Sequence, residues 1–121
     1  MKKSELGKWG EKVACDLLVS KGYAILLTNW HMFHYEIDII AMTDRYIVFV
    51  EVKTRSDDNE DPVMAVDRRK RQHMVASADV FLRYNDFPHE YRFDIVAITG
   101  TPQNYTVEHI PDAFFPTLKR H

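Results

Sequence analysis

The sequence predicts an α/β domain in which helices flank a mixed β-sheet, with the elements in the order α-β-β-β-α-β-β. Two patterns carry this prediction: two long segments with apolar residues at helical spacing, and five short runs rich in β-branched and aromatic residues. The length is a third observation, because 121 residues are enough for one domain with a substantial core. We therefore expect residues 1–121 to form a single domain.

The first helix is predicted to begin after Ser4, a residue type that caps helix N-termini, and to end at about Lys21. Its apolar residues recur at helical spacing: Leu6, Trp9, Val13, Leu17 and Leu18. Gly22 can supply the left-handed conformation that commonly ends a helix. Glu11 lies beside the apolar stripe on a flank of small residues, so it is either a solvated helix acid or part of a site.

Three strands are predicted to follow, at Tyr23–Asn29, Glu36–Ala41 and Ile47–Lys53. The segment 30–34 either extends the first strand or turns toward the second. A short polar turn at residues 43–45 makes the second and third strands an antiparallel hairpin. The third strand is nearly pure apolar sequence until its end, which is typical of a strand buried on both faces.

Charged residues interrupt two of these apolar strands. Strand alternation directs Glu51 and Lys53 to one side of the third strand, and Glu36 and Asp38 to one side of the second. If the two strands pair, then Asp38, Glu51 and Lys53 meet at one point. Charges at the end of a buried strand are costly without partners, so we interpret this cluster as a functional site. The alternative is a solvated network of ion pairs on an open sheet face.

A second long helix is predicted from Met64 to about Tyr84, after a polar and acidic surface loop at residues 54–62. The first turns of this helix contain the densest basic cluster of the chain, residues 68–71. Such a run is commonly a solvated helix face. It also follows the loop that leaves Lys53, so its side chains could border the same cleft and bind phosphates. Two further strands complete the sheet: Tyr91–Thr99 and Tyr105–Ile110.

The composition is that of a soluble globular protein, with 45% hydrophobic and 28% charged residues. A net charge of −2 gives no basic surplus, so nucleic-acid binding would depend on a local patch. Cys15 is the single cysteine, which excludes an internal disulfide and fits a reducing compartment. No apolar run reaches membrane-spanning length and the first residues do not form a signal-peptide core, so we expect a cytoplasmic protein with no membrane partner.

The helix with Glu11, the strand with Asp38 and the strand with Glu51-Val52-Lys53 form an ordered set that resembles the PD-(D/E)xK nuclease superfamily. This resemblance implies the restriction-endonuclease-like fold. More closely, the chain from Gly7 to Ile98 resembles the bacterial YraN-like family. The matching stretches are Gly10-Glu11 with Ala14, Gly22-Tyr23, Asn29-Trp30, Glu36-Ile37-Asp38 with Ile40-Ala41, Phe49-Val50-Glu51-Val52-Lys53 with Arg55, Lys70, and Arg92-Phe93-Asp94. The family is similar to archaeal Holliday-junction resolvases, which implies branched DNA as one substrate class.

The resemblance implies metal-assisted hydrolysis of phosphodiester bonds. Asp38 and Glu51, with the main-chain carbonyl of Val52, would hold Mg²⁺ or Mn²⁺. Lys53 would orient the attacking water or stabilise the transition state. Glu11 would be a further catalytic residue, and Glu36 a possible auxiliary for a second metal or a bridging water.

Arg55, Arg69 and Lys70 are the residues expected to contact nucleic acid, with DNA preferred over RNA. A junction-cutting enzyme needs two copies to address two strands, which makes a homodimer one expected state. The chain departs from the family pattern at Tyr35, where glycine is usual, and at His31, where arginine is usual. The missing arginine and the acidic loop favour the competing interpretation, a catalytically silent nucleic-acid-binding or protein-docking module on the same fold.

Overall fold

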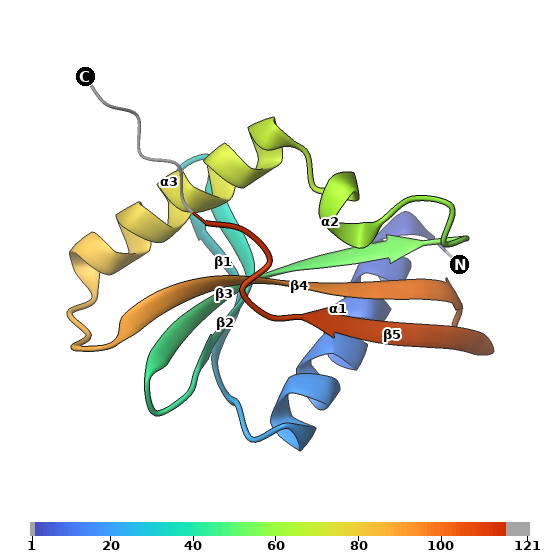
Figure 1. The fold of residues 1–121 in the computed structure, drawn as a ribbon, viewed down its shortest axis with the longest axis horizontal. Coiled ribbons are helices and arrows are strands. Elements are labelled where there is room, and N and C mark those ends of the chain that lie inside the picture. Colours follow the sequence, from blue (N-terminus) through green and yellow to red (C-terminus); the bar gives the residue numbers. More distant parts are fainter. Residues whose placement is uncertain (1, 116–121) are drawn as a thin grey trace.

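The computed structural model describes residues 2–115 and has the predicted architecture, a mixed sheet with helices on its two faces (Figure 1). The fold class predicted from the sequence is therefore confirmed. In chain order the elements are α1 (Lys3–Ser20), β1 (Ala24–Met32), β2 (Tyr35–Met42), β3 (Tyr46–Arg55), α2 (Pro62–Ala65), α3 (Arg68–Tyr84), β4 (Glu90–Thr101) and β5 (Asn104–Ile110).

The five strands lie side by side in their chain order. Neighbouring strands are antiparallel except for β3 and β4, which are parallel. A parallel pair cannot be joined by a tight turn, so the chain must cross over one face of the sheet between them. The crossover contains α2 and α3, and this topology brings the start of α3 over the end of β3 (Figure 1).

Each sheet face buries its own apolar core. On the α1 face, Ala14 and Leu18 pack against alternate residues of the central strands, which include Val48, Val50, Val96 and Ile98. On the α3 face the core is aromatic, and the ring of Phe49 contacts those of Phe81 and Phe93. Alternate side chains of one strand enter opposite cores, as strand geometry requires.

Gly10 lets α1 approach the sheet closely. A Cβ atom on Gly10 would lie 2.5 Å from Cγ2 of Thr54 on β3, whereas a Cβ on Gly7 would meet nothing within 4 Å. The helical cost of glycine is therefore compensated by packing at Gly10 only. This close approach also fixes the position of Glu11, the next residue on the helix.

The helix predicted from Met64 to Tyr84 is interrupted at residues 66–67. α2 ends at Ala65, and α3 begins after Asp67, whose side chain accepts a hydrogen bond from the backbone N–H of Lys70. Asp67 thus acts as an N-cap, which requires a non-helical backbone at that residue. The cap predicted at Ser4 was wrong, because α1 begins at Lys3 and Lys2 takes the N-cap position without a side-chain hydrogen bond. Gly22 has the expected positive φ of 91°.

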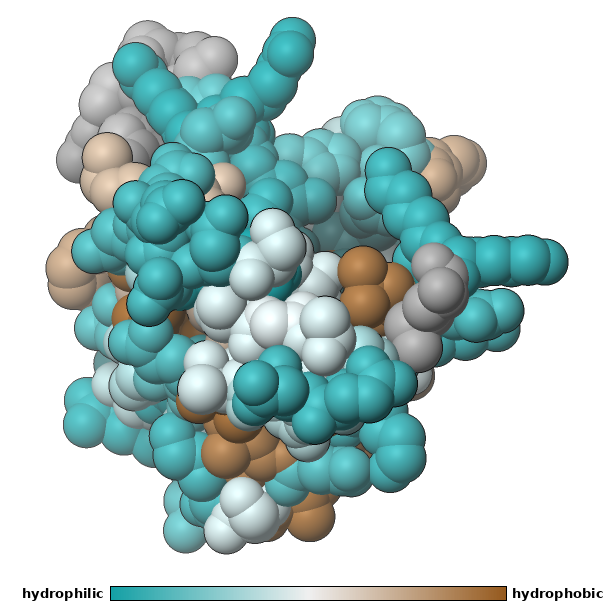
Figure 2. Space-filling model, turned by 90° about the vertical axis from the view of Figure 1, so that its right-hand side faces the viewer, coloured by the Kyte–Doolittle hydropathy of each residue, from teal (hydrophilic) through white to brown (hydrophobic). Residues whose placement is uncertain are grey.

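The surface at the open end of β3 is polar. The face that contains the β4–β5 turn and the segment after β3 is largely hydrophilic (Figure 2). Within residues 2–115, no helix is long and apolar enough to cross a bilayer.

Candidate functional site

The candidate site forms where β2 and β3 separate. The two strands pair from Met42–Ile47 to Ile39–Val50, and the ladder ends there. Beyond this point, the Asp38 carboxylate takes the place of a backbone partner, because its Oδ2 atom accepts a hydrogen bond of 2.8 Å from the N–H of Val52. The Asp38 side chain therefore lies in the fork between the strands.

Strand alternation is interrupted at Asp38. Its neighbours Ile37 and Ile39 would share a face in a regular strand, but Ile37 packs in the α3-side core and Ile39 in the α1-side core. The carboxylate can consequently contact groups on both sides of the sheet. Alternation alone, which grouped Asp38 with Glu36, does not describe the geometry at this residue.

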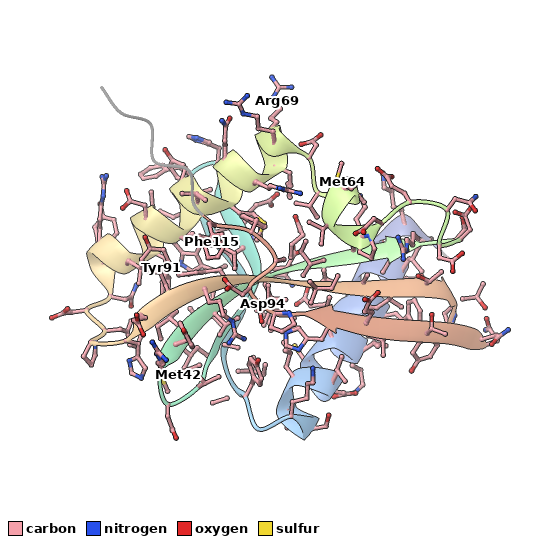
Figure 3. All side chains as sticks on the ribbon, viewed as in Figure 1. Met42, Met64, Arg69, Tyr91, Asp94 and Phe115 are labelled. Atoms are coloured by element: carbon pink, nitrogen blue, oxygen red, sulfur yellow. The ribbon has the colours of Figure 1, made fainter. Side chains whose placement is uncertain are left out.

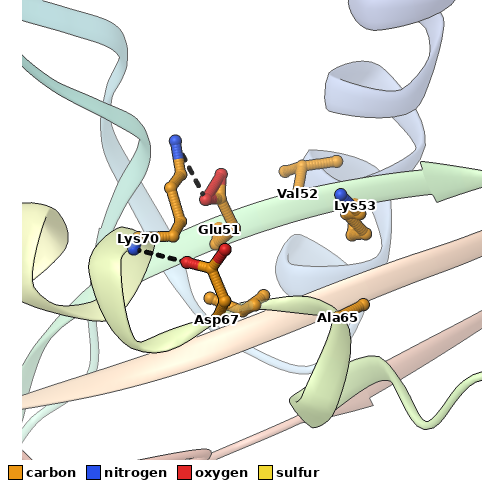
Figure 4. A pocket seen from close by; sticks show the side chains of 7 residues that line it. Glu51, Val52, Lys53, Ala65, Asp67 and Lys70 are labelled. Carbon is orange, nitrogen blue, oxygen red and sulfur yellow. Dashed lines mark hydrogen bonds and ion pairs between the residues drawn. The ribbon is translucent and has the colours of Figure 1, made fainter.

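Glu51 extends from β3 toward α3 and is the buried acid of the site. Its side chain is only 10% exposed, and its Oε2 atom lies 3.3 Å from Nζ of Lys70 (Figure 4). Burial disfavours the charged form, and hydrogen bonding and charge repulsion with Asp38 add to this effect, so the pKa of Glu51 is raised to about 9. At neutral pH the protonated form of Glu51 is therefore favoured in the metal-free site.

Lys70 is the cation that faces this pair. Its side chain is 41% exposed and reaches Glu51 from the first turn of α3. Burial opposes the ammonium form, but the charges of Glu51 and Asp38 and a hydrogen bond to Glu51 outweigh burial, so the pKa of Lys70 is raised. The residue expected to contact a nucleic-acid backbone thus lies inside the acidic site.

Lys53 shares a pocket with Glu51. The pocket has a volume of about 340 Å³ and is lined by Glu51, Val52, Lys53, Ala65, Val66, Asp67 and Lys70 (Figure 4). It opens between the end of β3 and the α2–α3 crossover. Two acids, Glu51 and Asp67, and two ammonium groups therefore border one polar, solvent-accessible space. Asp38 reaches Glu51 from β2.

Glu11 approaches the same region from the α1 face. Its Oε1 atom accepts a 2.8 Å hydrogen bond from Nδ2 of Asn29 on β1. Burial raises the pKa of Glu11, the Asn29 hydrogen bond partly offsets this, and the negative charge of Asp38 adds to the increase. The predicted proximity of Glu11 and Asp38 is thus present, and Asn29 is a residue of the site that our sequence analysis left without a role. Its sequence signals are the asparagine inside an apolar strand and its place in the Asn29-Trp30 stretch that matches the family. Asn29 adopts a positive φ of 49°.

The other predicted site residues lie farther from the Asp38–Glu51 pair or have structural partners. Glu36 is half exposed and pairs with His31 at 3.2 Å. Arg55 donates hydrogen bonds to Oγ1 of Thr99 and to the carbonyl of Glu60, so it fastens the loop after β3. Arg69 projects from the start of α3 into solvent (Figure 3).

Arg71, a member of the basic cluster, has a structural role. Its guanidinium donates hydrogen bonds to the carbonyls of Val63 and Val66 and lies over the ring of Phe114, 5.4 Å from its centroid. It therefore ties α2 and the segment after β5 to α3. Within the basic cluster at residues 68–71, Arg69 thus lies in solvent, Lys70 in the acidic site, and Arg71 against the core residue Phe114.

A second buried polar network is centred on Asp94 of β4 (Figure 3). The fully buried Asp94 carboxylate accepts two hydrogen bonds from Arg92, one from the backbone N–H of Asp112, and pairs with Nε2 of His109 at 2.7 Å. Burial would raise the pKa of Asp94, but these partners outweigh it and lower the pKa. Arg92 also donates a hydrogen bond to the hydroxyl of Tyr23, so the network links β4, β5 and the segment after α1, which supports a structural role for Asp94.

The carboxylates of the site suit a divalent cation. Within residues 2–115, no group of three or more His, Cys, Asp or Glu side chains is arranged to hold a metal ion. Magnesium, however, is commonly bound through one or two carboxylates while waters fill its remaining positions. Asp38 and Glu51 supply two such ligands beside an open polar pocket, and their mutual repulsion is what a cation would relieve. The donor set therefore fits Mg²⁺ or Mn²⁺.

The fold and the site define an α/β domain with a carboxylate pair and two lysines at the open end of a central strand. The chain belongs to the family described as uncharacterised protein family UPF0102, whose pattern matches residues 10–98. This agrees with the resemblance to the YraN-like family, and the matched region includes Glu11, Asp38, Glu51, Lys53 and Lys70.

Relatives in several bacteria match over nearly their whole length. A UPF0102 protein of Parabacteroides distasonis is 43% identical over 115 residues, which cover 94% of this chain and 95% of the relative. A UPF0102 protein of Bacteroides thetaiotaomicron is 40% identical over 116 residues, covering 95% and 96%. A UPF0102 protein of Flavobacterium psychrophilum is 42% identical over 113 residues, covering 93% and 95%. These names state a family and no activity.

Proposed function

We propose that this protein is a divalent-metal-dependent endonuclease that hydrolyses phosphodiester bonds in DNA, with branched or structured DNA as its substrate. One observation carries the proposal: Asp38 and Glu51 come from different strands and meet where the strands separate, beside a pocket lined by Lys53. Two acids at a strand fork, of which Glu51 is buried, are a costly arrangement for stability alone. The same arrangement is useful for holding a cation against a phosphate.

The roles of the residues follow from their positions. Asp38 and Glu51, with the main-chain carbonyl of Val52, would hold Mg²⁺ or Mn²⁺. The bound cation would supply an activated water and offset charge that develops on the scissile phosphate. Lys53 borders the same pocket, where its ammonium would orient the water or stabilise the transition state. The negative charge of Asp38 helps to raise the pKa of Glu11, and Glu11 would act as a further catalytic residue from the α1 face.

Lys70 would change partner as the site loads. Its ammonium lies 3.3 Å from Oε2 of Glu51 and offsets part of the negative charge of the Asp38–Glu51 pair while no other cation is bound. A divalent ion at Glu51 would repel it, and its long, partly exposed side chain can turn toward solvent. In that position the Lys70 ammonium would contact the nucleic-acid backbone together with the exposed Arg69. Arg55 would also contact the backbone if the loop after β3 moves.

The Lys70–Glu51 ion pair also favours a second candidate function. An ammonium 3.3 Å from the buried acid can compensate its charge without any metal. Such a site would serve a catalytically silent module that keeps the fold for binding nucleic acid or protein. The two functions differ in one respect that can be measured, namely whether cleavage depends on Asp38 and Glu51.

The deciding experiment is a cleavage assay on linear, flapped and four-way-junction DNA with Mg²⁺ or Mn²⁺. We expect the wild-type protein to cut, and Asp38→Asn and Glu51→Gln each to lower the rate at least about 100-fold. Glu108→Gln is the matched control, because it removes an exposed carboxylate on β5. Equal rates in the wild type and both site variants would refute the proposal. Metal-independent DNA binding without any cleavage would support the silent module.

A homodimer follows from the same proposal if the substrate is a junction. Cutting two strands symmetrically requires two copies of the chain around one substrate. We therefore expect light scattering to give a complex of two chains on four-way-junction DNA and fewer on a short linear duplex. A complex of one chain on the junction would argue for a substrate with a single cleavage point.

A further inference from the structure

The tip of the β1–β2 hairpin presents an aromatic ring to solvent. Met32 pairs with Tyr35, so Phe33 and His34 form a two-residue loop. Phe33 is 89% exposed and has a positive φ of 57°. Glycine is the residue that such a hairpin position favours, and a phenylalanine there is strained while burying almost nothing. Phe33 therefore does not stabilise the fold, and a role in binding is the alternative reason for an aromatic residue at this position.

Aromatic rings of the hairpin and of α3 pack together next to the tip. The rings of His34 and Tyr35 are 4.2 Å apart between centroids, and Tyr35 stacks on His73 of α3 at 6.1 Å with an interplanar angle of 17°. His34 is also 6.2 Å from His73. This aromatic column anchors the hairpin on α3, so Phe33 extends from a braced platform. The hairpin tip lies against α3 in Figure 1.

The platform lies on the same edge of α3 as the acidic site. Lys70 contacts Glu51, His73 follows one turn later and contacts Tyr35, and Ser77 follows another turn later. The Ser77 hydroxyl accepts a hydrogen bond from the N–H of Glu36 on β2. Positions three or four apart on a helix face the same side. The acid pair and the aromatic tip are thus neighbours along one helix face.

We propose that Phe33 at the hairpin tip stacks on an unpaired base of a nucleic acid whose backbone lies in the acidic site. This inference rests on the proposed function and specifies its substrate: single-stranded, flapped or branched DNA with an unpaired base next to the scissile phosphate. Every base has a face that can stack on an aromatic ring, but bases inside a continuous duplex have no unoccupied face. His34, which follows Phe33 in the loop, and His73, which contacts His34, have no negative charge that would repel a phosphate backbone.

Three substitutions at one exposed position test the inference. Phe33→Gly removes the ring and suits the backbone, Phe33→Leu keeps an apolar side chain without a π face, and Phe33→Trp keeps the stacking surface. We expect Phe33→Gly and Phe33→Leu to weaken binding of a single-stranded oligonucleotide about 5- to 150-fold, the range for loss of one stacked base. Phe33→Trp should bind as tightly as the wild type. Affinity for a blunt duplex should be the same in all four proteins.

The readout uses fluorescence of 2-aminopurine in the oligonucleotide, because stacking quenches this base. Wild type and Phe33→Trp should quench it, and Phe33→Gly and Phe33→Leu should not. The melting temperature of Phe33→Gly should be unchanged or higher, which excludes unfolding as the cause of weak binding. Unchanged single-strand affinity in Phe33→Gly would overturn the inference, as would wild-type affinity in Phe33→Leu, which would indicate an apolar protein contact instead.

Failure of this inference can be separated from failure of the proposed function. Cleavage that depends on Asp38 but not on Phe33 would overturn the stacking role alone. A wild-type protein that binds neither single-stranded nor duplex DNA, in the presence of Mn²⁺, would overturn both.

Discussion

Replacing Glu51 with glutamine should change how the stability of the metal-free protein depends on pH. The unfolded chain releases the Glu51 proton at the ordinary pKa of 4.5, whereas the folded chain retains it to higher pH. Between these two pKa values the folded state binds more protons, so the free energy of unfolding falls as pH rises. For one proton the slope is slightly above 1 kcal/mol per pH unit at most, or roughly 2–3 kcal/mol between pH 6 and pH 8. Glutamine mimics the protonated acid and has no such proton to lose.

Urea unfolding in EDTA at pH 6, 7 and 8 measures this difference directly. The wild type should lose stability with rising pH relative to Glu51→Gln, and the two curves should diverge most at pH 8. Glu108→Gln is the control and should follow the wild type, because Glu108 is exposed. Parallel curves for the wild type and Glu51→Gln would show that Glu51 is already ionised in the folded protein, and the reasoning from burial would be refuted.

Three further predictions concern the metal, the helix packing and the second polar network. Mn²⁺ should raise the melting temperature of the wild type and not that of Asp38→Asn, since a ligand that binds only the folded state stabilises it; an equal rise in both would place the ion elsewhere. Gly7→Ala should stabilise by about 1 kcal/mol through helix propensity, whereas Gly10→Ala should destabilise by about 1–3 kcal/mol because its Cβ meets Thr54, and urea unfolding compares them. Asp94→Asn should cost roughly 3–5 kcal/mol of unfolding free energy, because it leaves Arg92 without its buried partner. The variant should also lack the part of wild-type stability that is lost as pH falls through the lowered pKa of Asp94. Similar acid-unfolding curves for both proteins would contradict this.

Much of the candidate site could be predicted because strand chemistry is local. The apolar run of β3 ends at Glu51. On a central strand, an acidic side chain at that position needs either a polar partner or an opening to solvent. The preceding strand contains Asp38, and a short turn joins the two strands. Pairing of consecutive strands then brings the two together, and the structure shows this proximity.

The details that escaped sequence analysis depend on tertiary contacts. The interruption of alternation at Asp38 arises where the ladder between β2 and β3 ends, and no local pattern marks that point. Arg55 has the sequence context of a phosphate-binding residue, but its partners Thr99 and Glu60 come from another strand and from the loop. The helix break was different, since Asp67 three residues before Lys70 is a local N-cap signal that the basic cluster obscured.

The crossover between β3 and β4 has a consequence for the order of folding. The β1–β3 meander is built from contacts between near neighbours in the chain, whereas the parallel β3–β4 pair requires the whole α2–α3 segment to close first. We therefore expect the meander to form early, with Glu51 still hydrated and ionised at neutral pH. Docking of α3 would then bury Glu51, so the last phase of folding should take up a proton. Stopped-flow refolding with a pH indicator can time that uptake against the burial of the aromatic core.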